Sequence, residues 1–535
     1  MEEFYPSNHS KFISVAGSYD DDKLLSSGSY NATKGSSTTF SGDFSAQMNK
    51  SFQGGHDLFA TFQYSVSQQE YEEVTHYTSG FPNSRMDNIT YARQYASNAT
   101  PTGSQGLNRN LGLLLTAGYS YKDRYMLDAT IRANASSAFG TKNRWATFWS
   151  TGVAWNLHKE SFLEYIDWLE QLKLRFSMGS SGNQNYASTN ALAVYNYYND
   201  SFYNGFTGVS LDNMENPYLG WEQKMDYNIG LDFRSKHWTV ALDAYIADTE
   251  NLVFSRSILP STGFTSFSDN LGKVRNKGVE AAVTYRVFSG RDGYFNLNAK
   301  IAYNNNRILE ISDALRDYNA LQQKQAADTN STQPIIQYYD GCALNAIWAV
   351  KSLGIDPASG KEIFVDKNGN MTNEWSASNL TYCGSSDPLF NGNFGFNAEY
   401  KKFGLNAVVT FYGGGYKYNT TLVNKVENVY IGKNVDKRIY SSRWYYPGQV
   451  AQYRNGYTSN TKATTRFVQE NNTLSVSSVS AYYDFPLDMV QKIGLERLRF
   501  TIYANDLATF STIKIERGTS YPYARSISFS LLATF

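Results

Sequence analysis

The sequence Ala524-Arg525-Ser526-Ile527-Ser528-Phe529-Ser530-Leu531-Leu532-Ala533-Thr534-Phe535 ends the chain. Apolar side chains occupy every second position from Ile527 to Phe535, and serine or threonine fills most of the others, with Leu532 as the exception. This alternation predicts a β-strand that has an apolar medium on one face and a polar space on the other. As an exposed edge of a soluble sheet, such a strand would favour aggregation. The pattern therefore favours the closing strand of a transmembrane barrel.

The same alternation returns in pairs of segments that are joined by short polar turns, which predicts antiparallel hairpins. The clearest pairs are 108–121 with 125–133, 227–233 with 238–247, and 394–400 with 403–411. In each pair the charged residues keep to one face, so the opposite face can contact lipid. The predicted inward positions are Asp128, Arg132, Asp232, Asp243, Glu399 and Arg499. We therefore expect an all-β, transmembrane antiparallel β-barrel with a polar lumen.

The connections between the predicted strands fall into two length classes. Short turns lie at 122–124, 234–237, 288–292 and 401–402, and long polar stretches lie at 72–107, 181–222, 309–333 and 416–472. Outer-membrane barrels have short periplasmic turns and long extracellular loops, so we expect the C-terminus on the periplasmic side. About 16 strands can be placed, beginning at Lys11–Tyr19.

Two segments do not follow the hairpin pattern. Residues 158–171 are expected to form a short amphipathic helix on the periplasmic side. The segment from Ile335 to Pro388 has no clear assignment, and strand parity requires it to cross the membrane twice or not at all. Both alternatives remain open from the sequence.

Composition narrows the class of protein less sharply. The 535 residues carry 48 Lys plus Arg and 48 Asp plus Glu, so electrostatics give no reason to expect a nucleic-acid partner. Aromatic residues make up 16% of the chain, which suits either a tyrosine-rich soluble β-protein or the aromatic girdles of a membrane barrel. No stretch approaches the ~18 apolar residues of a membrane-spanning helix.

Residues that could support catalysis or bind a metal are sparse. The five histidines are widely spaced, and Gly179-Ser180-Ser181-Gly182 lacks the nucleophile-elbow pattern, so we expect no enzyme activity, cofactor or metal. The run from Asp366 to Asn370 shares part of a calcium-loop pattern, but a turn is the better interpretation. Cys342 and Cys383 could form a disulfide or remain free thiols.

A series of collinear motifs between about residue 40 and residue 535 resembles SusC/RagA-type TonB-linked outer-membrane transporters. The motifs are Tyr121-Lys122-Asp123-Arg124-Tyr125, Ala129-Thr130-Ile131-Arg132, Ser136-Ser137-Ala138-Phe139-Gly140, Asn143-Arg144-Trp145, Leu172-Lys173-Leu174-Arg175, Leu219-Gly220-Trp221-Glu222, Asn228-Ile229-Gly230-Leu231-Asp232, Asn270-Leu271-Gly272-Lys273-Val274-Arg275-Asn276-Lys277-Gly278, Gly354-Ile355-Asp356-Pro357 and Tyr482-Tyr483-Asp484-Phe485-Pro486.

The resemblance implies a barrel of about 22 strands that encloses an N-terminal plug. It also implies import of an oligosaccharide or peptide across the outer membrane, a SusD-like surface lipoprotein as partner, and energy from TonB–ExbB–ExbD. Nothing in residues 1–535 resembles a plug or a TonB box. We therefore expect the chain to be the C-terminal part of the barrel, with about 16 to 18 of its strands.

Substrate contacts are expected in the lumen and the long loops, where aromatic rings can stack on sugars or hold a peptide. The candidates are Tyr197, Tyr198, Trp444 and Tyr445. An alternative is that these rings belong to an interface girdle or are covered by the lipoprotein. For the function as a whole, the alternatives to import are a plug-free passive channel and a structural barrel that serves as a scaffold.

Overall fold

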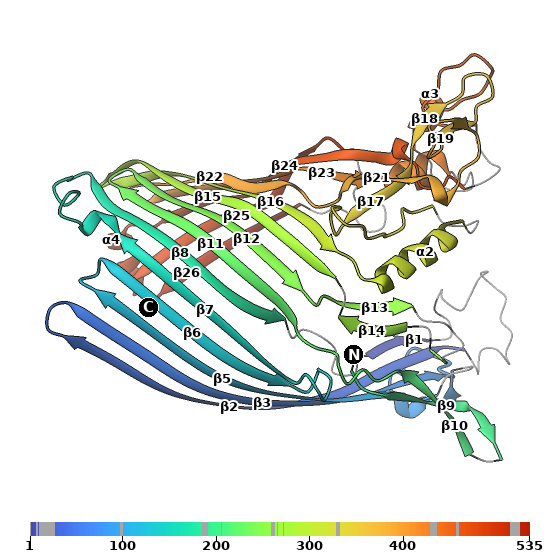
Figure 1. The fold of residues 1–535 in the computed structure, drawn as a ribbon, viewed down its shortest axis with the longest axis horizontal. Helices are drawn as coiled ribbons and strands as arrows, with labels where there is room; N and C mark the ends of the chain where they lie inside the picture. Colours follow the sequence, from blue (N-terminus) through green and yellow to red (C-terminus); the bar gives the residue numbers. More distant parts are fainter. Residues whose placement is uncertain are drawn as a thin grey trace.

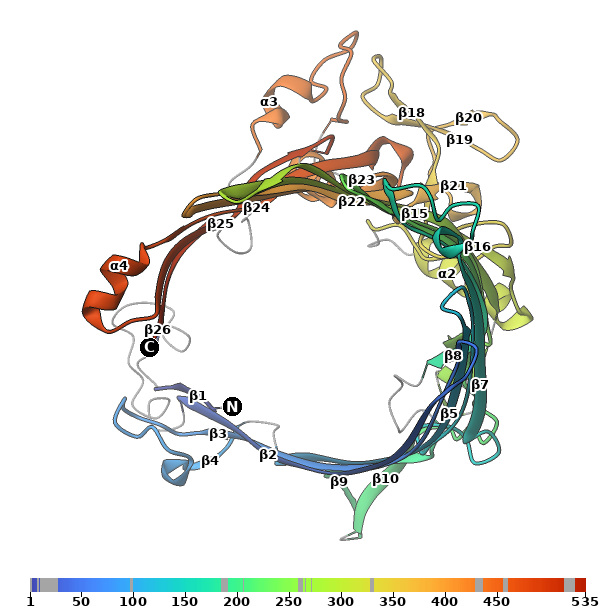
Figure 2. The same ribbon diagram turned by 90° about the vertical axis from the view of Figure 1, so that its left-hand side faces the viewer.

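The architecture is a single large curved sheet with folded loops at one end. The computed structural model describes residues 2–6, 9, 27–96, 100–183, 191–204, 206–257, 263–264, 266–270, 272–327, 332–428, 436–455, 460–513 and 525–535. Seventeen strands form the sheet, and neighbouring strands pair antiparallel. Viewed along its axis, the sheet curls into a ring (Figure 2). The predicted antiparallel β-barrel fold is confirmed.

The strands of this wall lie side by side almost in chain order (Figure 1). They are β1 (Glu2–Tyr5), β2 (Ser29–Phe52), β3 (His56–Ser79), β4 (Gln94–Tyr95), β5 (Thr102–Tyr121), β6 (Tyr125–Ser136), β7 (Trp145–Asn156), β8 (Leu169–Asn183), β11 (Glu222–Ser235), β12 (Trp238–Glu250), β15 (Lys273–Gly290), β16 (Gly293–Glu310), β22 (Phe390–Tyr400), β23 (Phe403–Tyr418), β24 (Val468–Asp484), β25 (Arg497–Ser511) and β26 (Ser526–Thr534).

The remaining elements lie in the connections. Small sheets pair β9 (Val194–Tyr203) with β10 (Phe206–Asn213), β13 (Val253–Ser257) with β14 (Ser266–Asn270), β17 (Ala346–Val350) with β21 (Leu380–Ser385), and β18 (Ser352–Ile355) with β19 (Glu362–Val365) and β20 (Met371–Thr372). The helices are α2 (Asp313–Ala327), α3 (Arg438–Ser442), α4 (Leu487–Val490), the π-helix η5 (Leu422–Glu427) and the 3-10 turns η1 (Ile89–Tyr91), η2 (Leu157–Lys159), η4 (Ala377–Asn379), η6 (Thr465–Phe467) and η7 (Gln491–Ile493). In the part of the chain described, no helix combines the length and apolar character needed to cross a membrane.

The three hairpins expected from alternation are present, and their registers keep equivalent faces together. Across β5 and β6, Thr116 lies opposite Thr130 and their hydroxyl groups are 3.2 Å apart. In the three-residue turn between these strands, Lys122 and Asp123 have positive φ, 51° and 53°, and the Arg124 N–H group donates to the Tyr121 carbonyl oxygen at 2.9 Å, as a type I′ turn requires. The local sequence therefore fixes both the pairing and the side of the sheet that each residue faces.

The wall has a short-turn end and a long-loop end. At the short-turn end, strands are joined by connections such as 53–55 and 401–402. The hairpins β9–β10 and β13–β14 and the described residues of 311–389 lie at the long-loop end (Figure 1). The segment from Ile335 to Pro388 adds no strand to the wall, because β16 pairs directly with β22 from Gly293 to Tyr303. Of the two possibilities left open by parity, the structure therefore has the one without crossings.

The predicted helix at 158–171 is wrong. Only the 3-10 turn η2 and a series of turns precede β8, which begins at Leu169. The carboxylate of Glu160 accepts hydrogen bonds from Tyr125 Oη at 2.8 Å and Trp155 Nε1 at 2.9 Å, which ties the segment to the ends of β6 and β7. Pairing of β8 with β11 then takes the C-terminal residues of the segment. The first predicted strand, Lys11–Tyr19, lies outside the described residues.

The two ends of the sheet lie on the same side of the ring (Figure 2). Within the described residues, β26 is hydrogen-bonded to β25 alone, and β1 covers only Ser29 to Ala32 of β2. Both β2 and β26 run from the long-loop end to the short-turn end, so they are parallel to each other. The rest of β2, from Thr33 to Phe52, has β3 as its one described neighbour.

Candidate functional site

The long-loop end carries a folded structure, here called the loop assembly, made of the described residues of 311–389 and 419–467. It adjoins the long-loop ends of β16, β22, β23 and β24 (Figure 1). Apolar residues form two clusters in it, one around Val350 and Trp348 and one around Val423 and Phe467. The two loops meet at a parallel bridge between Val350 and Thr464. The loop assembly therefore has a packed interior of its own, unlike a set of independent loops.

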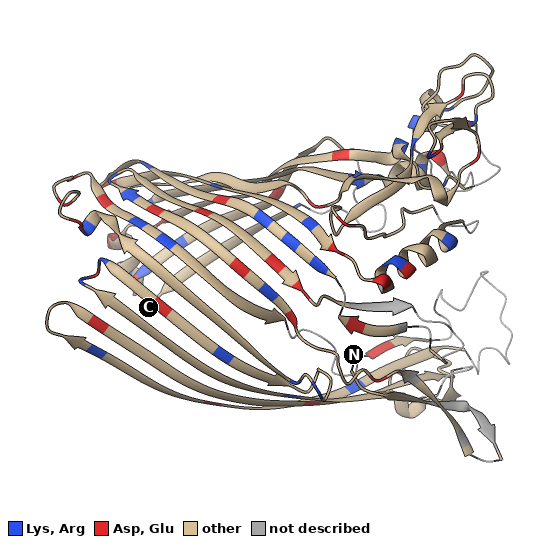
Figure 3. Ribbon diagram, in the orientation of Figure 1, with Lys and Arg blue, Asp and Glu red and all other residues tan. Residues whose placement is uncertain are grey.

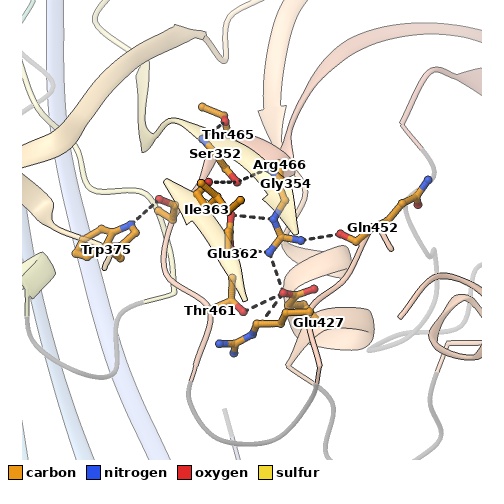
Figure 4. Close-up of polar contacts among 12 residues, drawn as sticks. Ser352, Gly354, Glu362, Ile363, Trp375, Glu427, Gln452, Thr461, Thr465 and Arg466 are labelled. Atoms are coloured by element: carbon orange, nitrogen blue, oxygen red, sulfur yellow. Dashed lines mark hydrogen bonds and ion pairs between the residues drawn. The ribbon is translucent and has the colours of Figure 1, made fainter. Parts of the chain in front are cut away.

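Charged side chains are buried where these loops meet (Figure 4). Arg466 donates to both carboxylate oxygens of Glu362, at 2.8 and 2.7 Å, and to Glu427 Oε1 at 2.8 Å. Its remaining NH1 group donates to the carbonyl oxygen of Gln452 at 2.8 Å. Glu362 is 6% exposed and Glu427 is 2% exposed. One guanidinium thus joins β19, η5 and the segment before β24.

Burial and pairing act in opposite directions on these arginines. Burial alone would lower the pKa of Arg466, but its hydrogen bonds to Glu362 and the charges of Glu362 and Glu427 raise that pKa above its ordinary value. Burial lowers the pKa of Arg454, even though Glu427 lies 3.4 Å from its Nε. A buried pair of this kind is costly to break from one side, because the remaining charge has no solvent. The network therefore holds the two loops in one arrangement.

Arg443 completes the connection at η5. It is 2% exposed, and its NH2 group donates to the carbonyl oxygens of Val426 at 2.5 Å and Glu427 at 2.9 Å. Carbonyl groups at the end of a helix have no partner within the helix, and a cation there satisfies them. The arginine therefore anchors the 436–455 segment to η5.

The predicted site residues fall into three situations. Trp444 Nε1 donates to the Pro357 carbonyl oxygen at 2.9 Å, and its ring packs against Gly360, whose φ is +69°. Trp444 is therefore a packing residue between the two loops. Tyr445 is 55% exposed, and its hydroxyl group donates to the Ile439 carbonyl oxygen at 3.0 Å, so most of its ring remains accessible.

Tyr197 and Tyr198 belong to β9, where they lie opposite Val209 and Gly208 of β10. Their side chains lie outside the described residues. The β9–β10 hairpin and α3 lie on opposite sides of the ring, as both views show (Figures 1 and 2). The structure therefore does not bring the two predicted aromatic groups together into one site.

The inner face of the wall carries ion pairs between neighbouring strands. Arg175 of β8 donates to both oxygens of Asp232 at 2.9 and 3.0 Å, and to Asp243 Oδ2 at 3.1 Å. The prediction included both aspartates as inward residues but missed Arg175 as their partner. Strand register, which places Arg175 beside Gly230 between the two acids, is the signal that would have found it.

A second inward group lies near the short-turn end. Glu399 accepts a hydrogen bond from Tyr482 Oη at 2.6 Å, and Arg499 lies 3.9 Å from the centre of the Tyr482 ring. Asp484, which the prediction did not include, pairs with Arg499 through two oxygens, at 2.9 and 2.5 Å. Arg132 bonds Asn134 at 2.8 Å, whereas Asp128 lies against Gly152. These groups make a polar lumen wall without a constellation for catalysis.

The Asp366 motif forms a turn, as the sequence favoured. Asp366 Oδ1 accepts hydrogen bonds from the backbone N–H groups of Asn368 and Asn370, both at 2.8 Å. Gly369 supplies the left-handed φ of +86° that this turn between β19 and β20 needs. Within the described residues, no group of three or more His, Cys, Asp or Glu side chains has an arrangement that could hold a metal. Cys342 and Cys383 are free thiols.

Comparisons with known proteins agree with this architecture. Residues 4–507 match the family model described as TonB dependent receptor-like, beta-barrel. The chain is 25% identical over 516 residues to the TonB-dependent receptor P39 of Formosa agariphila, covering 86% of this chain and 48% of that protein. It is 30% identical over 271 residues to the TonB-dependent receptor SusC of Bacteroides thetaiotaomicron, covering 48% of this chain and 26% of SusC.

Solved structures show the same fold. A chain of the RagAB peptide transporter superposes with a TM-score of 0.80 at 20% identity, covering 91% of this chain and 53% of that one. The chain spans about half the length of P39 and of the matched RagAB chain. The family model, the SusC match and the RagAB fold together confirm the SusC/RagA resemblance. The chain belongs to the TonB dependent receptor-like β-barrel family, which is a family of outer-membrane proteins.

Proposed function

We propose that this chain forms wall and loops of a TonB-dependent importer that carries an oligosaccharide or a peptide across the outer membrane. The observation that carries the proposal is the match of residues 4–507 to the receptor barrel family, together with similarity to SusC and to the RagAB peptide transporter. The ion pairs of the inner face and the apolar outer face suit a polar passage through a lipid bilayer. Transport, and not catalysis, is the function that these residues support.

In the proposed orientation, the long-loop end faces the outside and Phe535 lies on the periplasmic side. The support is the separation of connections by length, since barrels of this class place their short turns in the periplasm. The loop assembly would then be the surface that first meets the nutrient. Of the predicted contacts, Tyr445 is the one whose accessible ring suits stacking on a sugar or a peptide, and Tyr197 and Tyr198 remain predictions.

We also propose that the chain supplies the C-terminal part of the barrel. The support is the parity of the edges: β2 and β26 are parallel, so an antiparallel wall between them needs an odd number of additional strands. The first of these would extend β1 along the uncovered length of β2. Because β1 and β4 pair over only a few residues, 15 of the 17 strands span the wall, and a barrel of about 22 strands would need about seven more there. A plug and the TonB–ExbB–ExbD contact would also come from outside residues 1–535.

A SusD-like surface lipoprotein is the proposed partner at the long-loop end. The loop assembly offers one folded interaction surface there, because its two loops are joined by Arg466 and by the two apolar clusters. Exposed aromatic residues at its tip, Tyr440 at 79% and Tyr446 at 63%, provide contact area of the type found at interfaces. Co-purification of the lipoprotein with the intact protein tests this part.

The transport proposal is tested by uptake in cells that carry or lack the gene encoding this chain. Labelled oligosaccharides and peptides are offered separately, with and without a protonophore that removes the proton-motive force. We expect uptake of one substrate class to require both the gene and the energised membrane. Uptake that persists with the protonophore would indicate a passive channel, and gene-independent uptake of every substrate would argue for a structural barrel.

A further inference from the structure

The outer face of the wall has a groove at the level where β8, β11, β12, β15 and β16 lie side by side. It holds about 360 Å³ and is lined mainly by apolar side chains. Its centre follows one row of the sheet, in which Ile229, Ala244, Val279 and Tyr303 lie opposite one another on four successive strands. Ala244 is the smallest residue of that row, so the surface is recessed there.

The walls of the groove stand out from the sheet. Ile229 is 59% exposed, Val279 53% and Tyr303 42%, and Phe176 and Tyr227 close the side toward β8 and β11. A groove with such walls on a lipid-facing surface has the shape and the chemistry to hold one acyl chain.

A basic group marks one end of the groove. Lys277, which lines it, lies two residues from Val279 toward the long-loop end, a step of about 7 Å along a strand. Lys277 is exposed and forms no ion pair with any described residue. A lysine at this position can cover apolar surface with its stem and place its ammonium group at the membrane interface.

The surroundings of Lys277 are also basic. Toward the long-loop end, the same face carries Arg275 and Lys273 on β15 and Arg307 on β16, and basic positions of β15 gather there (Figure 3). Three acids lie beside them: Asp248 and Glu250 on β12, and Glu310 on β16, which lies opposite Lys273. Arg275 pairs with Asp248 at 2.6 and 2.7 Å, and Lys273 pairs with Glu250. Four bases against three acids leave a net positive charge, which resides at Lys277 and at Arg307, whose guanidinium donates to Asn305 and to the Gly341 carbonyl oxygen.

We propose that this groove binds a phosphate-bearing membrane lipid, with an acyl chain against Ala244 and a phosphate group at Lys277. The basic residues around Lys277 favour an anionic headgroup. The recess at Ala244, in the row that runs from Ile229 to Tyr303, has room for an acyl chain beside that headgroup. In the proposed orientation, the site lies at the outer leaflet. The inference rests on the proposed placement of the wall in the outer membrane but not on the transport activity.

Binding is tested on the intact protein, purified from outer membranes in a mild detergent. The probe is hexa-acylated lipid A that carries both phosphate groups, titrated while native mass spectrometry counts bound lipid. We expect Lys277→Gln to weaken binding about fivefold, the factor that corresponds to about 1 kcal/mol for one basic residue near an anionic surface. Ala244→Leu fills the groove and should weaken binding of lipid A with and without its phosphates.

Both matched controls lie on β16, the strand that pairs with β15. Lys300→Gln removes a lysine from the inner face of β16, and Ala299→Leu enlarges an alanine of the outer face away from the groove, so neither should change lipid A binding. Equal affinity of the wild type and Lys277→Gln would overturn the proposal. Competition by inorganic phosphate as strong as that by lipid A would also overturn it, since it would identify a free-phosphate site.

Uptake of nutrient by the same variants separates the two proposals. Loss of lipid binding with unchanged uptake supports the lipid site and leaves transport standing. If the protein transports none of the offered substrates, the lipid titration still shows whether the groove binds lipid A.

Discussion

The wall and the loop assembly are held together in different ways. In the wall, partners lie on neighbouring strands, such as Thr116 and Thr130 across one hairpin, and each side chain faces either lipid or lumen. In the loop assembly, the central contact joins Glu362 and Arg466, which are 104 residues apart. The wall is therefore specified by a repeating local pattern, whereas the loop assembly depends on a few buried polar contacts. This difference predicts where single substitutions act.

The largest effect is expected for Arg466→Ala. It leaves Glu362 and Glu427 buried without their shared cation, so we expect the loop assembly to lose about 3–5 kcal/mol of stability while the wall stays folded. Hydrogen exchange measures both: protection should fall in β19 and η5 but not in β11 and β12. Arg316→Ala is the control, because its pair with Asp313 is exposed and should contribute under about 0.5 kcal/mol. Equal hydrogen-exchange protection of β19 and η5 in the two variants would show that the ion pairs of Arg466 do not hold the two loops together.

A charge on the outer face should damage the wall instead. Ile229 lies near the middle of β11 and is 59% exposed toward lipid, so Ile229→Arg should cost about 2–4 kcal/mol. Asn228→Arg, one residue earlier and on the opposite face, should cost much less. Urea unfolding in lipid vesicles compares the two. Similar losses for both variants would show that the two faces do not have the assigned environments.

Gly360→Ala tests the packing between the loops at a smaller scale. An added Cβ would meet the Trp444 ring, and the φ of +69° is unfavourable for any side chain, so we expect a loss of about 1–3 kcal/mol. Gly369→Ala is the matched control, because its φ is +86° but no atom lies within 4 Å of the added Cβ. Thermal unfolding followed by tryptophan fluorescence should separate the clash from the backbone strain. Equal losses of stability in Gly360→Ala and Gly369→Ala would mean that the Trp444 ring moves aside at no energetic cost.

The smallest effect is expected from acid. Hydrogen bonds from the Ser359 hydroxyl and the Ala358 backbone lower the pKa of Asp356 below its ordinary 3.8. A carboxyl group with a lowered folded-state pKa stabilises the fold above its unfolded pKa, and this contribution disappears as the pH falls through the folded value. The 356–360 turn should therefore loosen only below the usual carboxyl range. Hydrogen exchange at the Ala358 amide measures this loosening. In Asp356→Asn, exchange at Ala358 should no longer depend on the protonation of residue 356, and at neutral pH the turn should stay closed.

The sequence predicted the wall well for a physical reason. Alternation, short turns and the polarity of each strand face are local properties of the sequence. The three strongest hairpins and the class of fold could therefore be predicted directly. The helix at 158–171 failed because Glu160 is drawn to Tyr125 and Trp155, a contact that the local amphipathic pattern does not contain. The β13–β14 hairpin was missed because it is short and polar.

The candidate site was predicted less well. Arg466 contacts Glu362, and Trp444 contacts Gly360, because two long loops pack against each other. No periodic pattern in the sequence indicates that packing. Trp444 and Tyr445 are adjacent in sequence, yet one is packed and the other accessible. Adjacent aromatic residues in a loop can therefore have unrelated roles, which only the fold distinguishes.

The loop assembly rests on strands whose ladder is interrupted. The register of β23 with β24 shifts between Tyr412 and Gly415, where Gly414 has a φ of +74°. Below that point the pairing of β23 with β24 continues to Phe403 with one further shift at Val408, and above it the two loops are bound to each other through Arg466. Thermal motion should therefore concentrate at the glycine run, with the loops tilting as one body and not each on its own. Force applied to the 419–467 loop would reach the barrel as a torque at that joint, whereas force on the 311–389 loop would also reach β16 and β22, from which that loop leaves the wall.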